Sequence, residues 1–228
     1  MNIEQRYNFV YKPLVFIASL TPIVWLVCGG LGVLGQSLGP DPIKFTLHAI
    51  GKTALNFLML TLLVTPVRHI AGWPHVVRIR RMLGLFAFFY ALLHFGIYLG
   101  LDQEFNFAGL FADIVKRPYI TIGFIALLML IPLAVTSTNR MMRRLGRRWQ
   151  TLHRLIYVIA ILGVWHYYWQ VKRDVREPLI YAAILAVLLG YRLVRRARIS
   201  RAAAQVAPRP VAQAATSKSE SATAPERT

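Results

Sequence analysis

Long apolar runs alternate with short polar segments along most of this chain. Six of the runs are long enough, at about 20 residues each, to cross the roughly 30 Å hydrocarbon core of a bilayer as helices. These runs cover residues 13–34, 46–67, 82–101, 119–135, 152–171 and 178–194. The pattern predicts an all-α integral membrane protein built as a bundle of six transmembrane helices.

The connecting segments differ sharply in charge. The segment after the second run carries Arg68, Arg78, Arg80 and Arg81 without an acid, and the segment after the fourth carries five arginines within 140–148. Arginine and lysine accumulate in cytoplasmic loops of membrane proteins. We therefore expect these loops, and with six spans both termini, to lie in the cytoplasm.

The same reasoning divides the chain into three parts. Residues 1–12 form a cytoplasmic N-terminus, 13–195 form the six-helix transmembrane domain, and 196–228 form a basic, Ala/Ser/Pro-rich tail. The tail has no apolar periodicity, which predicts disorder. We expect the first run to be a membrane anchor that is retained, because it is long enough to span. No internal repeat and no soluble domain are evident.

Composition narrows the class of protein further. The 228 residues are 56% hydrophobic and carry a net charge of +18, which in a soluble protein would suggest a nucleic-acid partner. Here the basic residues lie between apolar runs, so the expected partner is the lipid bilayer and not nucleic acid. The single cysteine, Cys28, excludes an internal disulfide and argues against an iron–sulfur cluster.

Three histidines lie within or at the edge of apolar runs, namely His94, His153 and His166. Histidine inside a membrane bundle is rare and marks a functional site, and it is a common axial ligand of haem iron. His94 lies about 18 Å and His166 about 21 Å along their helices from the cytoplasmic end. The two imidazoles should therefore meet at similar depth, as a bis-histidine clamp for a haem that carries electrons.

His153 and His48 are weaker candidates for binding the cofactor. His153 lies about 20 Å from His166 along the helix axis, which suits a second redox layer, although the two residues project from different helix faces. It could pair with a loop histidine, bind one face of a cofactor or contact a cofactor edge. His48, near the start of the second run, could face the haem between His94 and His166, orient one of its propionates, or act as an alternative ligand.

Two other kinds of function compete with electron transfer. A transporter or channel could use the histidines as a proton relay, but the six runs contain no Asp or Glu. A membrane scaffold could use them only to bond neighbouring helices.

Several stretches of the chain resemble the MsrQ/YedZ family, a branch of the ferric-reductase-like transmembrane group. The resemblance runs in order through residues 12–195, and its most specific part is the Leu-Gly-x-x-Trp-x-x-Leu-His run. The matching stretches include His48, 51–55 (GKTAL), 80–85 (RRMLGL), 92–94 (LLH), 117–119 (RPY), 136–138 (TST), 145–157 (LGRRWQTLHRLIY) and 166–167 (HY).

The resemblance implies a bacterial inner-membrane, multi-pass electron-transfer subunit without substrate chemistry of its own. It implies haem b, either one or two, with His94, His153 and His166 as iron ligands, together with FMN. Electrons would come from the quinone pool or a cytosolic flavin reductase. They would pass to MsrP, a periplasmic molybdopterin enzyme that repairs methionine sulfoxide in oxidised proteins. A different cytochrome b-type ferric reductase is the alternative within the same group.

Overall fold

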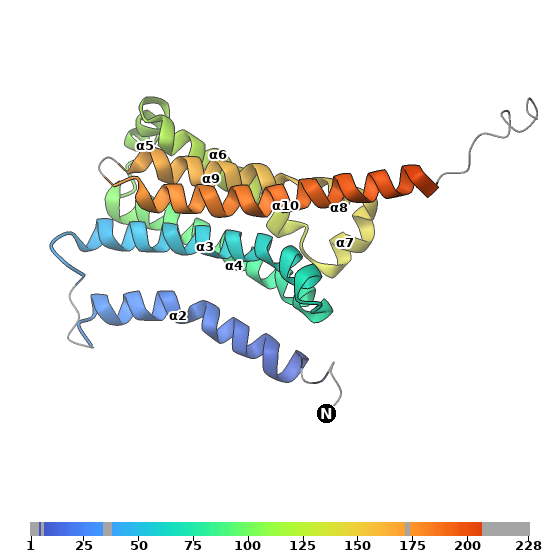
Figure 1. Ribbon diagram of the computed structural model, residues 1–228. Helices are drawn as coiled ribbons and strands as arrows, with labels where there is room; N and C mark the ends of the chain where they lie inside the picture. The colour runs from blue at the N-terminus through green and yellow to red at the C-terminus, as the bar shows by residue number, and fades with distance from the viewer. Residues whose placement is uncertain (1–4, 6, 34–37, 172–173, 207–228) are drawn as a thin grey trace, which may run out of the picture. The chain divides into compact units, whose positions relative to one another are not determined.

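The computed structural model describes residues 5, 7–33, 38–171 and 174–206, and every regular element within them is helical (Figure 1). The chain forms two compact units, Met1–Leu189 and Gly190–Thr228. The site discussed below belongs entirely to the first unit.

Each of the six predicted runs coincides mainly with one long helix. These helices are α2 (Lys12–Gly30), α3 (Pro42–Ile70), α4 (Val77–Ile97), α6 (Pro118–Val135), α9 (Leu155–Gln170) and α10 (Arg176–Val206). The all-helical fold is thus confirmed for the described residues.

Five helical stretches in the described part of the chain are long and apolar enough to cross a membrane. They are Phe9–Gly30, Pro42–Ile70, Pro74–Asp102, Pro118–Val135 and Arg176–Ala202. The remaining predicted span corresponds to α9, whose 16 residues extend about 24 Å. This helix is shorter than the hydrocarbon core, so the number of spans stays a prediction.

Shorter helices precede or connect the long ones, and the sequence pattern does not predict them. They are η1 (Tyr7–Tyr11), η2 (Pro74–Val76), η3 (Tyr98–Asp102), α5 (Phe107–Lys116), α7 (Asn139–Leu145) and α8 (Arg147–Leu152). Asn106 caps α5, because its side-chain oxygen accepts from the Gly109 amide at 2.9 Å.

The start of α3 is defined by a cap and a proline. Asp41 accepts a hydrogen bond from the Lys44 amide at 3.1 Å, and Pro42 occupies the first turn, where its missing N–H costs nothing. The Lys44 ammonium also donates to the Asp41 carboxylate, which lowers the pKa of Asp41. The cap therefore stays ionised at neutral pH.

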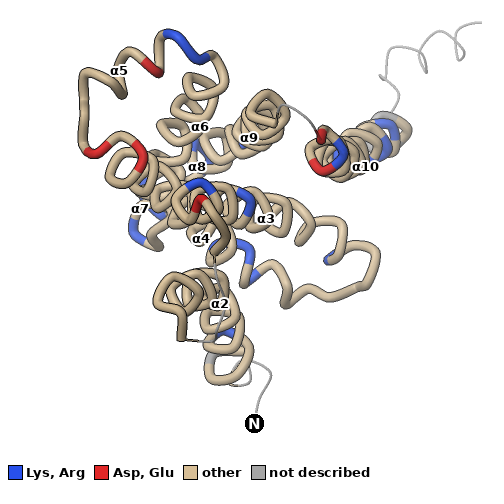
Figure 2. Tube along the Cα trace, turned by 90° about the vertical axis from the view of Figure 1, so that its left-hand side faces the viewer, with Lys and Arg blue, Asp and Glu red and all other residues tan. Residues whose placement is uncertain are grey.

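Helices α3, α4, α6 and α9 form a closed group in which each helix packs against the next, and α9 returns to α3. We call this group the four-helix core. Both α3 and α6 begin, and α4 and α9 finish, at the end of the core that carries α5 (Figure 1). We call it the α5 end, and Figure 2 views the molecule from this end.

Aromatic packing joins α2, α3 and α4 beside this core. Tyr90 is fully buried, its ring stacks on Phe57 at 5.4 Å between centroids, and its hydroxyl donates to the Ser19 carbonyl oxygen at 2.6 Å. A buried hydroxyl needs such a partner, since leaving it unpaired is costly.

Helix α10 extends into the residues that the sequence pattern assigns to the C-terminal tail. Residues 196–206 were expected to be disordered, but α10 continues through them to Val206. Arg and Ala are strong helix formers, and no proline interrupts them before Pro208. Residues 207–228, the rest of the predicted tail, lie outside the described residues, as do residues 1–4 and 6 of the predicted N-terminal segment.

The Tyr90 hydroxyl gives a test of the packing between α2 and α4. We expect Tyr90→Phe to lower the free energy of unfolding by about 1 kcal/mol, the usual loss for one buried hydrogen bond. Denaturant titration of the protein in detergent micelles measures the change. Tyr11→Phe, at an exposed tyrosine, is the control, and equal losses in both variants would contradict the assignment.

Candidate cofactor site

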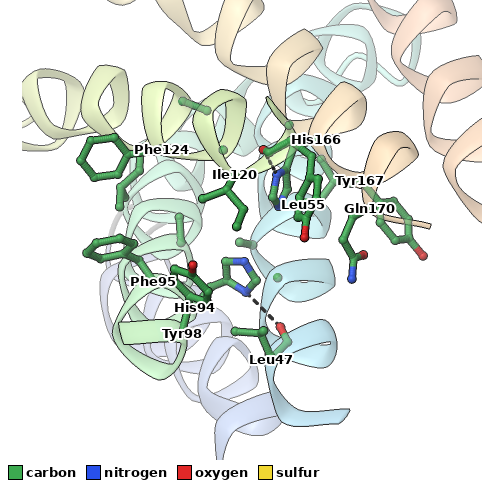
Figure 3. A pocket seen from close by; sticks show the side chains of 18 of the residues that line it. Leu47, Leu55, His94, Phe95, Tyr98, Ile120, Phe124, His166, Tyr167 and Gln170 are labelled. Carbon is green, nitrogen blue, oxygen red and sulfur yellow. Dashed lines mark hydrogen bonds between the residues drawn. The ribbon is translucent and has the colours of Figure 1, made fainter. Parts of the chain in front are cut away.

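The four-helix core encloses a cavity of about 520 Å³ at its α5 end (Figure 3). This volume lies in the range of small-molecule and cofactor sites. The walls come from α3, α4, α6 and α9, with η3 and one residue of α5, Ile114, completing them. Most of the lining is aliphatic or aromatic, so polar side chains in it need a specific reason to be there.

His94 of α4 and His166 of α9 reach into this cavity from opposite helices (Figure 3). Their ring centroids are 6.1 Å apart, and the ring planes cross at 81°. The structure thus brings together the two histidines whose matching depths suggested a pair.

A backbone carbonyl determines the tautomer of each imidazole. The Nδ1 atom of His94 lies 2.9 Å from the Leu47 carbonyl oxygen, and Nδ1 of His166 lies 2.7 Å from that of Tyr119. A carbonyl oxygen only accepts, so Nδ1 carries the proton in both rings. The lone pair of each ring is then on Nε2, the arrangement that metal-binding histidines use.

Two glycines make these hydrogen bonds possible. Gly51 lies one helical turn after Leu47 in α3, and Gly123 lies one turn after Tyr119 in α6. A Cβ atom at Gly51 would be 2.9 Å from the His94 ring, and one at Gly123 would be 2.8 Å from the His166 ring. Any larger residue would therefore push an imidazole away from its carbonyl.

The geometry of the pair suits one metal ion between the rings. Bonds of about 2 Å from each Nε2 to a shared ion would separate the ring centres by about 6 Å. The observed separation of 6.1 Å matches this value. The donor set, two neutral imidazoles in an apolar cavity, also suits iron held in a flat organic macrocycle.

His48 lies at the mouth of the same cavity and is exposed. Its Nε2 contacts the side-chain amide nitrogen of Gln170, which is a donor, so Nε2 accepts. The lone pair of His48 is therefore engaged, and its proposed role as a ligand or cofactor contact stays a prediction.

His153 does not line this cavity and lies in the turn between α8 and α9. Its ring stacks on Trp149, and its Nε2 lies 3.1 Å from the Thr136 hydroxyl. That hydroxyl donates its proton to the Pro132 carbonyl oxygen at 2.6 Å. It must accept from His153, so Nε2 of His153 is protonated, opposite to His94 and His166. Iron binding by His153 stays a prediction.

The two halves of the site repeat each other, which the sequence pattern did not reveal. Each histidine bonds a carbonyl 47 residues earlier in the chain. The cavity residues of the α3–α4 pair recur in the α6–α9 pair after a constant interval, 166 − 94 = 72 positions. The identical pairs are Gly51 and Gly123, Ala54 and Ala126, Leu55 and Leu127, Leu58 and Leu130, and His94 and His166.

The expectation that the chain lacks an internal repeat is therefore wrong for these helices. The repeat is hard to detect because the sequence is otherwise dissimilar and most positions are simply apolar. Its clearest signal is the Ile-Gly-x-x-Ala-Leu-x-x-Leu pattern at residues 50–58 and 122–130. The carbonyls of Leu47 and Tyr119 carry no side-chain signal at all.

The fold and site define a class of protein: a helical bundle with long apolar helices and a two-histidine cavity that suits a metal cofactor. A family model described as "Ferric reductase like transmembrane component" matches residues 50–164, which include both halves of the repeat up to Val164.

Similar proteins narrow this class. One from Rhodospirillum rubrum is 53% identical over 82% of this chain and 91% of its own length. One from Xanthomonas euvesicatoria pv. vesicatoria is 48% identical over 85% and 90%, and one from Herminiimonas arsenicoxydans is 50% identical over 80% and 84%. Each is named "Protein-methionine-sulfoxide reductase heme-binding subunit MsrQ".

The chain belongs to the MsrQ family of ferric-reductase-like transmembrane proteins. It is a multi-pass membrane protein, as the family and its apolar helices indicate.

The two glycines give a test of the site geometry. We expect Gly51→Ala and Gly123→Ala each to lower the free energy of unfolding by about 1–3 kcal/mol, because the new methyl group overpacks an imidazole. Gly96→Ala is the matched control. It lies in α4, and a Cβ atom added there would meet nothing within 4 Å. There alanine should be neutral or stabilising. A similar response at all three positions, measured by denaturant titration in micelles, would rule out the proposed close packing.

Proposed function

We propose that this protein is a membrane electron-transfer subunit that binds haem b between His94 and His166. Through this haem it would serve a methionine-sulfoxide reductase. The observation that carries the proposal is the arrangement of the two imidazoles, each with its Nδ1 against a backbone carbonyl. Both hold the Nδ1 proton against a carbonyl and leave Nε2 available, with ring centres 6.1 Å apart.

The chain's own residues have separable roles in this proposal. His94 and His166 would hold the haem iron, and the carbonyls of Leu47 and Tyr119 would orient the two imidazoles and raise their basicity. The apolar lining, which includes Leu55, would keep water away from a bound cofactor. Haem iron supplies a one-electron couple whose potential depends on its ligands, hydrogen bonds and burial.

The direction of transfer follows from the charge of the loops. Segments 68–81 and 140–148, rich in arginine, connect the ends of the core helices opposite the α5 end. By the positive-inside rule they lie in the cytoplasm, which places the cavity near the outer surface of a bacterial inner membrane. Six spans with α9 as the fifth then leave both termini in the cytoplasm.

The donor and acceptor are proposed by class. Electrons would enter from the quinone pool or a cytosolic flavin reductase and leave to a periplasmic molybdopterin enzyme of the MsrP type. The relatives' printed name supports the link to methionine sulfoxide reduction, since it makes them the haem-binding subunit of such a reductase. The protein would carry electrons and leave the substrate chemistry to its partner.

Two further parts of the proposal rest on family resemblance alone. FMN is one. The second is another haem at His153, for which Nε2 would have to leave Thr136 or Nδ1 would have to bind. The ratio of haem to protein in the purified sample distinguishes one haem from two.

Loss of either axial ligand tests the haem proposal directly. We expect His94→Ala and His166→Ala each to abolish the low-spin b-type bands in a reduced-minus-oxidised spectrum. His75→Ala, in an exposed segment, should keep them. Haem content is measured by pyridine haemochrome, and unchanged low-spin haem in both ligand variants would eliminate this assignment.

A second experiment tests the proposed acceptor. Dithionite-reduced protein, freed of excess reductant, should be reoxidised when the purified molybdopterin reductase and methionine sulfoxide are added together. His166→Ala should not support this transfer. Reoxidation by a ferric chelate, without any response to the reductase, would favour the alternative of a ferric reductase.

A further inference from the structure

The cavity has one apolar end and one charged end. Deep in the four-helix core its lining is Leu58, Ala87, Leu130 and other aliphatic residues. Near the α5 end the lining includes Lys44, Lys52 and Arg117 as well as Asp102. A ligand that fits both ends must be apolar over most of its area and anionic at one edge.

Lys52 and Arg117 lie beside the two halves of the histidine site. Lys52 directly follows Gly51, against which His94 packs, and Arg117 lies two residues before Tyr119, which bonds His166. They belong to α3 and to the start of α6, and in the four-helix core α3 and α6 separate the two histidine-bearing helices. The two cations therefore lie on different sides of the line that joins the imidazoles.

Each of these cations is held by an acid while keeping donors for another anion. Nζ of Lys52 lies 2.6 Å from Oε2 of Glu177, and Nε of Arg117 lies 3.2 Å from Oδ1 of Asp113. The Lys52 ammonium has three N–H donors and the guanidinium has five, so one acid does not exhaust either group. Asp113 is itself fixed by the Tyr98 hydroxyl, which donates to it at 2.8 Å.

Lys44 is a weaker candidate for binding the anionic edge of such a ligand. Its ammonium is paired with Asp41, its side chain is 67% exposed, and its backbone belongs to the α3 cap. The Lys52 side chain is only 38% exposed. We therefore assign Lys44 a role in the cap at the start of α3 and not in ligand binding.

We propose that Lys52 and Arg117 bind the two propionate carboxylates of the haem, one each, and so fix which edge of the haem faces the α5 end. This inference rests on the proposed haem site between His94 and His166. It makes Lys52 and Arg117 positioning residues, with Glu177 and Asp113 holding them ready.

Esterified haem gives a direct test, because it removes the two charges and keeps the macrocycle. Full-length protein, produced without haem precursor and purified in detergent, is titrated with haem b or with its dimethyl ester, and the Soret band is followed. We expect the wild type to bind haem b more tightly than the ester. Lys52→Gln and Arg117→Gln should each reduce this preference by about tenfold, the usual scale for one charge-assisted hydrogen bond.

Lys116→Gln is the matched control, because it removes the same charge beside Arg117 from a residue that does not line the cavity. It should leave the preference unchanged. Lys52→Arg keeps the positive charge and should keep the preference for haem b. If Lys52 had a purely structural role, its loss would weaken the binding of haem b and of the ester equally.

The outcomes separate this inference from the proposed function. If the wild type binds haem b and the ester equally well, the propionate contacts are wrong while the histidine site stands, even if the variants fail to fold. If Lys52→Gln and Arg117→Gln fold and still prefer haem b over the ester as strongly as the wild type does, the propionate contacts are likewise wrong. If the wild type gives no low-spin spectrum with either form, the haem site itself is wrong.

Discussion

The site depends on one contact made twice, in which an imidazole N–H donates to a helix carbonyl over a glycine. Leu47 and Tyr119 are within helices, so their carbonyl oxygens also have a helical partner and use a second lone pair for the histidine. An imidazole can reach that lone pair only where the helix surface has no Cβ atom in its way, and Gly51 and Gly123 provide such a surface. The tautomer of each histidine, and with it the direction of the free lone pair, follows from this packing.

The opposite end of the four-helix core uses a histidine in the reverse way. His153 donates through Nε2 to Thr136, and the Trp149 indole donates to the Thr136 carbonyl oxygen at 3.0 Å. These bonds hold the end of α6 to the turn that leads into α9. Histidine thus holds two helices together at one end of the core and presents a free lone pair at the other. The hydrogen-bond partner of each imidazole makes this difference.

Much of the fold could be predicted from the sequence, because long apolar runs have few structural solutions in a membrane. The matched depths of His94 and His166 also suggested their proximity, since helices of known rise convert sequence position into height. What could not be predicted depends on contacts between helices. The carbonyls of Leu47 and Tyr119 are invisible in side-chain patterns, and the protonation of His153 depends on a threonine from α6. Helix α5 was missed because a single turn signal, Asn106, precedes a short amphipathic stretch.

The repeat of the α3–α4 pair in α6–α9 has a consequence for how the cavity is filled. Two helix pairs that share glycine, alanine, leucine and histidine positions form opposite walls that match at these positions. A planar molecule inserted with either face toward α4 meets almost the same surroundings. The differences are confined to unequal pairs such as Lys52 and Phe124, or Tyr98 and Gln170. Which face of such a molecule turns toward α4 would then depend on these unequal pairs.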